Sequence, residues 1–136
     1  MNKDNAYNNS EPNPVVEKSL LFAEKILKLC KDLFLQKEFI VSKQIGRSAT
    51  SIGANIAEAE RAQSKPDFYA KMKIAEKEAN ETAYWLKLLV RTGDISDTLY
   101  NELENNLREL CSMLAAICKT TKENIEKEEK RKQKSI

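Results

Sequence analysis

The residues with the clearest chemical potential lie near the middle of the chain. The stretch 45–58 reads IGRSATSIGANIAE and contains two of the three glycines, Gly46 and Gly53. A glycine-rich phosphate loop is therefore the first chemistry to test. Such a loop needs a Lys-Ser or Lys-Thr pair after its last glycine and a strand before it, and the sequence provides neither.

Three carboxylates are the next residues that could do chemistry, as ligands of a metal ion. Glu58, Glu78 and Glu81 could converge around a hard cation such as Mg²⁺, which prefers oxygen ligands. We favour structural pairing with Arg47 instead, because an unpaired buried acid is costly. The chain has no histidine, which removes the usual general base and the Ser-His and Cys-His arrangements. We therefore expect no enzyme activity, no cofactor and no metal site.

The composition predicts a soluble cytoplasmic protein of one domain. The 136 residues carry a net charge of only +2, so charge alone does not announce a nucleic-acid-binding protein. No apolar run is long enough to cross a bilayer, and the Asn-rich N-terminus lacks the apolar core of a signal peptide. Cys30, Cys111 and Cys118 fall on apolar helical positions, as expected of small buried side chains in a reducing compartment.

Hydrophobic periodicity predicts an all-α, up-down-up-down four-helix bundle. Ser64-Lys65-Pro66-Asp67 has the composition of a helix N-terminus, and Gly93 is suited to end the helix that follows. The expected divisions are a disordered segment at 1–13, a bundle at 14–122 with helices at about 14–36, 39–62, 65–91 and 97–122, and a charged helix end and tail at 123–136.

The first helix has two apolar stripes, more than one neighbouring helix requires. A heptad-like stripe lies beside a second one. They consist of Val16, Leu20, Ala23, Leu27, Cys30 and Phe34, and of Phe22, Ile26, Leu29 and Leu33.

The opening stretch fits a helix, since residue type changes with angle around the axis. Isoleucines form a core face. A second face has only small groups, which predicts close approach of another helix backbone. The small face consists of Gly46, Thr50, Gly53 and Ala57, and a polar strip beside it consists of Arg47, Ser51 and Glu58.

The third helix carries a second apolar patch opposite its core face. Ile74, Trp85 and Leu88 form it, with two carboxylates in its midst. Such a patch predicts an interface between subunits; alternatively, the acids point to water beside a partly buried Trp85. The expected oligomer interface or structural polar cluster consists of Arg47, Ser51, Glu58, Glu78, Glu81, Ile74, Trp85 and Leu88.

Residues 47–89, RSATSIGANIAEAERAQSKPDFYAKMKIAEKEANETAYWLKLL, resemble the core of bacterial four-helix bundle proteins encoded in intervening sequences of 23S rRNA genes, the S23 family. The chain departs from the family pattern at Ala59, where glycine is common, and at Gly53, where proline is common. The matching residues are Arg47, Ser51, Ile52, Asn55, Ile56, Ala57, Glu58, Phe68, Glu78, Glu81 and Leu86.

The resemblance implies a ring-like homopentamer, related to the accessory variability proteins of diversity-generating retroelements. We expect a non-enzymatic oligomer that contacts RNA or DNA through basic surfaces. The alternative is a protein–protein adaptor or scaffold in a mobile-element-associated system. No membrane or small-molecule partner is expected. The candidate nucleic-acid contacts are Lys71, Lys73, Lys77, Lys87 and Arg91 on the third helix.

Overall fold

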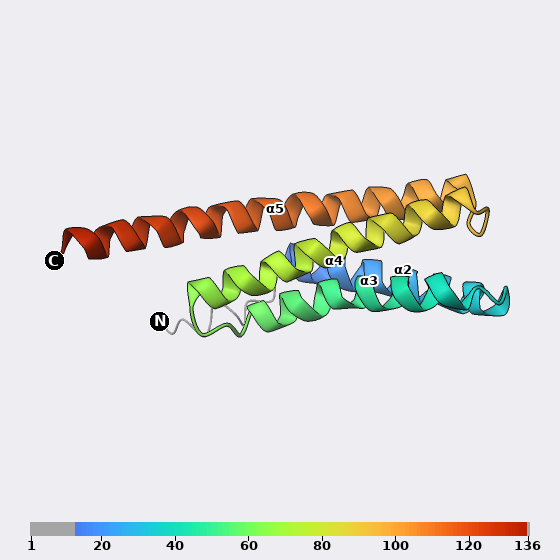
Figure 1. The fold of residues 1–136 in the computed structure, drawn as a ribbon, viewed down its shortest axis with the longest axis horizontal. Coiled ribbons are helices and arrows are strands. Elements are labelled where there is room, and N and C mark those ends of the chain that lie inside the picture. Colours follow the sequence, from blue (N-terminus) through green and yellow to red (C-terminus); the bar gives the residue numbers. More distant parts are fainter. Residues whose placement is uncertain (1–12, 136) are drawn as a thin grey trace.

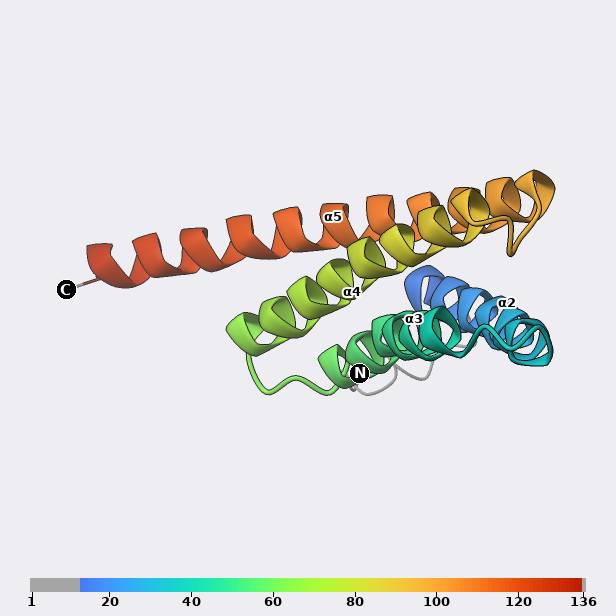
Figure 2. The ribbon, with the colours of Figure 1, turned by 45° about the vertical axis from the view of Figure 1, so that its right-hand side comes forward.

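Four consecutive helices run antiparallel to one another in the computed structural model, which describes residues 13–135 (Figures 1 and 2). The described residues contain no strand, so the all-α prediction is confirmed. No helix among them is long and apolar enough to cross a bilayer. The predicted disordered segment lies, except for Asn13, outside the described residues. The helices are α2 (Pro14–Leu35), α3 (Phe39–Ala59), α4 (Lys65–Arg91) and α5 (Asp97–Lys134).

Local sequence signals fix most helix ends. Ser64 Oγ accepts a hydrogen bond from the backbone N–H of Asp67 at 3.2 Å, as expected of an N-cap. Ser96 caps α5 in the same way. Gly93 follows α4 with a φ of 77°, the left-handed conformation that glycine adopts without strain. Because the helices begin and end at these signals, the links that join them, at 36–38, 60–64 and 92–96, are short.

The last helix extends further than the sequence analysis expected. α5 continues to Lys134 instead of ending near residue 122, and its C-terminal end projects past the other helices (Figure 1). Lys65, at the start of α4, forms an ion pair with Glu128. Basic residues in the last turn of α5 also favour the helix, because they interact with the negative end of its dipole.

The core is built mainly from one of the two apolar stripes of α2. Phe22, Ile26 and Leu33 are no more than 2% exposed, whereas Leu20, Leu27 and Phe34 are 48–64% exposed. The heptad-like stripe is therefore largely at the surface. In the core, buried side chains from all four helices form one continuous cluster.

Candidate functional site

The glycines of the central stretch lie on α3 where it approaches α2. A Cβ atom added to Gly46 would lie 3.2 Å from Cys30 Sγ, and one added to Gly53 would lie 3.2 Å from Ser19 Oγ. These distances are tight for carbon contacts, so a small residue suits each position. The close-packing face is narrower than predicted, because Thr50 and Ala57 are exposed.

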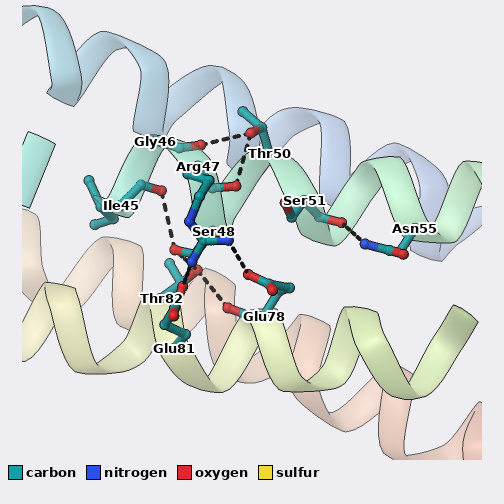
Figure 3. Close-up of polar contacts among 10 residues, drawn as sticks. All are labelled: Ile45, Gly46, Arg47, Ser48, Thr50, Ser51, Asn55, Glu78, Glu81 and Thr82. Atoms are coloured by element: carbon teal, nitrogen blue, oxygen red, sulfur yellow. Dashed lines mark hydrogen bonds and ion pairs between the residues drawn. The ribbon is translucent and has the colours of Figure 1, made fainter. Parts of the chain in front are cut away.

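Arg47 joins α3 to α4 through two carboxylates (Figure 3). Its Nη1 lies 3.2 Å from Glu78 Oε2, and its Nη2 pairs with Glu81. The Arg47 side chain is 49% exposed, that of Glu78 only 16%. The predicted pairing of Arg47 with these two acids therefore exists within one chain, at its surface.

Glu58 does not belong to this cluster, contrary to the sequence interpretation. Its Oε2 lies 3.3 Å from Lys71 Nζ. Glu58 is eleven residues beyond Arg47, about 16 Å along the helix axis, so the two side chains meet different parts of α4. Ser51 accepts a hydrogen bond through its backbone carbonyl from Asn55 Nδ2 at 2.8 Å. Residues 13–135 hold no group of three metal-ligating side chains.

Beneath Arg47, a buried hydroxyl pair links the same two helices (Figure 3). Ser48 Oγ and Thr82 Oγ1 lie 2.8 Å apart, and both residues are 0% exposed. Thr82 also donates to the carbonyl oxygen of Glu78 at 2.8 Å. Sequence reasoning missed this pair, because serine and threonine are common at exposed helix positions too. The hydroxyl pair and the Arg47 contacts therefore join the same segments of α3 and α4.

The exposure of Arg47 leads to a first prediction. Arg47→Ala is expected to lower the free energy of unfolding by about 1 kcal/mol or less, as for other solvated ion pairs. Urea unfolding at low protein concentration measures this. Arg108→Ala is a matched control, because Arg108 pairs with Glu104 at 2.8 Å and is 72% exposed. A loss of about 3 kcal/mol or more would show that these ion pairs are desolvated within the single chain.

The predicted apolar patch of α4 is smaller than expected. Ile74 is 41% exposed, but Trp85 and Leu88 are partly buried and pack against the core. The Trp85 indole nitrogen is buried and has no hydrogen-bond partner among the described residues. The patch alone therefore offers little apolar surface to a second subunit.

A more extensive apolar surface lies where α2 turns into α3. Phe34 and Phe39 are in edge-to-face contact, with ring centroids 5.1 Å apart. Part of this surface is an open groove that also includes Cys30 and Ser42. The signal for it was the heptad-like stripe of the first helix. We call it the hairpin apolar surface, and it consists of Leu27, Phe34, Leu35, Phe39 and Ile40, which are 48–80% exposed.

The five candidate nucleic-acid contacts do not share one face of α4. Lys71 lies about 120° around the axis from Lys77 and pairs with Glu58. The other four are exposed and lie within about 80° of one another on the helical wheel. We call them the basic face: Lys73, Lys77, Lys87 and Arg91.

The members of the basic face differ in how far they are neutralised. Lys73 Nζ donates to Glu76 at 2.7 Å, and this hydrogen bond raises the pKa of Lys73. Lys87 Nζ lies 5.2 Å from the centroid of the Tyr100 ring, a cation–π contact that leaves its charge intact. No acid among the described residues forms an ion pair with Lys77, Lys87 or Arg91.

Sequence reasoning missed one residue of this region, Tyr84. It is 62% exposed and stands seven residues from both Lys77 and Arg91. Seven residues make almost two full turns, so the three share one side of the helix. The Tyr84 ring meets Trp85 edge-to-face, with centroids 5.0 Å apart and an interplanar angle of 79°. The signal that could have identified Tyr84 was its spacing of seven residues from a cation on each side.

The cysteines show no sign of a reactive thiolate. Burial raises the pKa of Cys30, Cys111 and Cys118, and the thiol form predominates when the pKa is raised. All three are free. Their environment is that of apolar packing residues, as the sequence predicts.

Comparison with known proteins places the chain in a family. The model of the 23S rRNA-intervening sequence protein family matches residues 11–116. The chain belongs to this family. A crystal structure from Bacteroides thetaiotaomicron, described as a protein with unknown function from the S23 ribosomal protein family, is 55% identical to it. The TM-score is 0.76, and the match covers 77% of this chain and 98% of that one. No curated protein matches the chain.

The family membership confirms the main resemblance seen in the sequence. Neither the family description nor the S23 neighbour's description states an activity, a ligand or an oligomeric state. The relation of this 23S rRNA-intervening sequence family member to the retroelement accessory proteins stays a prediction.

Proposed function

We propose that this family member is a non-enzymatic homo-oligomer that binds RNA or DNA through the basic face of α4. The observation that carries the proposal is the position of Lys77, Lys87 and Arg91. All three are exposed on one side of a single helix, and their charges are not cancelled by ion pairs among the described residues. Positive side chains arranged in this way bind phosphates and release counterions.

Assembly would multiply this weak local attraction. The hairpin apolar surface is the support for self-association, because exposed apolar groups of this extent mark interaction sites. Following the family resemblance, we propose a ring-like homopentamer, which would repeat the basic face five times. Repeated weak contacts on one nucleic acid raise the overall affinity through effective concentration.

We also propose that the protein works in the cytoplasm. The three free cysteines are the support, because thiols persist in a reducing compartment. A non-enzymatic role is part of the same proposal, as no arrangement described above pairs a nucleophile with a general base.

The direct test of nucleic-acid binding is a titration followed by fluorescence anisotropy. Labelled RNA and DNA oligonucleotides of about 20 nucleotides are mixed with the full chain at about 50 mM salt. We expect saturable binding that weakens as salt is added. The absence of binding to either nucleic acid at low salt would refute the proposal.

The second candidate function is a protein–protein adaptor or scaffold in a mobile-element-associated system. The open groove beside Phe34 and Leu35 favours it. Affinity capture from the native host with and without ribonuclease and deoxyribonuclease separates the two functions. Recovery that depends on nucleic acid supports the first, and a stoichiometric protein partner that survives nuclease treatment supports the second.

A further inference from the structure

We propose that Tyr84 stacks on unpaired bases, so that the basic face selects single-stranded nucleic acid over duplex. This inference rests on the proposed nucleic-acid binding and names the class of nucleic acid that the site prefers. Base stacking goes beyond the attraction between cations and phosphates, which acts on single-stranded and duplex nucleic acid alike.

The first support is the arrangement of cations around the ring. Lys77 and Arg91 are fourteen residues apart, about 21 Å along the helix, and Tyr84 stands midway between them. All three side chains are exposed. A strand whose phosphates contact both cations must therefore pass over the tyrosine, where one of its bases can meet the ring.

The second support is that the two acids of α4 on either side of Tyr84 on the helical wheel are already paired with cations. Glu76 accepts a hydrogen bond from Lys73, and Glu81 pairs with Arg47. The two acids that flank the basic face are thus each held by a cation. A phosphate backbone that approaches Tyr84 meets net positive charge there.

The third support is the way the ring is held. Trp85 packs against the hydrophobic core, and its ring contacts Tyr84 edge-to-face at 5.0 Å. Edge-to-face pairs are favourable for aromatic rings. Tyrosine also loses little conformational entropy on binding, because only two side-chain torsions must be fixed. Tyr84 is therefore braced on one side while it remains 62% exposed.

The chemistry of the bases decides which strand form fits. In a duplex the bases are stacked on one another, so a protein surface meets the sugar-phosphate backbone and the base edges in the grooves but not the base faces. In a single strand they can turn outward and stack on an aromatic side chain, and every base has a π-face to offer. A tyrosine flanked by cations suits the single strand and adds nothing for the duplex.

The test compares wild type, Tyr84→Ala and Tyr84→Phe, using single-stranded and duplex oligonucleotides of the same length. Tyr84→Ala is expected to weaken single-strand binding by about tenfold or more, the usual effect of losing one base–aromatic contact. Duplex binding should stay unchanged. Tyr84→Phe keeps the ring and should bind as the wild type does.

A second readout comes from Trp85, the single tryptophan of the chain. Because it touches Tyr84, its fluorescence should change when a saturating amount of single strand binds to the wild type. The same amount of single strand should cause no change in Tyr84→Ala. Circular dichroism confirms that each variant is folded.

The outcomes separate the inference from the proposed function. Equal binding of single strand and duplex, with no loss in Tyr84→Ala, would overturn base stacking while leaving phosphate binding in place. No binding of either form by the wild type would overturn both.

Discussion

Replacing Lys77, Lys87 and Arg91 together with glutamine is expected to weaken RNA binding by at least about tenfold at about 50 mM salt. Each substitution removes a positive charge that would otherwise displace a counterion from the nucleic acid. Glutamine keeps a long polar side chain with good helix propensity. The three positions are exposed, so the fold should be unaffected. Fluorescence anisotropy with a labelled RNA measures the affinity.

The matched control removes three other exposed lysines. Lys28, Lys43 and Lys130 are exposed on α2, α3 and α5, outside both the basic face and the groove beside Phe34. Their triple glutamine variant has the same net charge as the first. It should keep most of the wild-type affinity. An equal loss in both variants would mean that overall charge, and not the basic face, attracts the RNA.

The second large effect concerns assembly. Phe34→Asp combined with Ile40→Asp is expected to convert the oligomer into a 15.5 kDa monomer. Phe34 is 64% and Ile40 78% exposed in the single chain, so its own stability should change little. Beneath another subunit, two unpaired carboxylates would be costly to desolvate. Light scattering at micromolar concentration gives the mass.

The control for this variant places the same charges elsewhere. Asn101→Asp with Asn105→Asp changes two exposed positions on α5 and should leave the oligomer intact. A wild-type protein that is itself monomeric would contradict the assembly proposal. An oligomer that survives Phe34→Asp with Ile40→Asp would show that subunits meet at another surface.

Local sequence rules were enough to predict the helices and the close packing of α3. Ile45, Ile52 and Ile56 of α3 repeat at helical spacing, so they define one buried face. Gly46 and Gly53 are placed seven residues apart, and such spacing puts both against the same neighbour. Ser64, Ser96 and Gly93 mark helix ends through hydrogen bonds and backbone conformation that involve only nearby residues. These features depend little on the rest of the fold.

Features set by distant parts of the chain were harder to predict. The two apolar stripes of α2 are equally regular, and only packing against α3 and α5 decides that Phe22 and Leu33 are buried while Phe34 is not. The partner of Glu58 depends on the position of α3 along the axis of α4. Near the end of α5, Glu128 pairs with Lys65 of another helix. Each of these outcomes requires the relative positions of two helices.

The salt dependence of RNA binding tests the central claim most directly. We would measure the association constant of wild type and of the triple variant at Lys77, Lys87 and Arg91 over a range of salt concentrations. If these three cations contact phosphates, the slope of log K against log salt should be shallower in the variant by about 2, the value expected for three contacts on a single strand. Equal slopes for the two proteins would contradict the assignment of nucleic-acid binding to the basic face of α4.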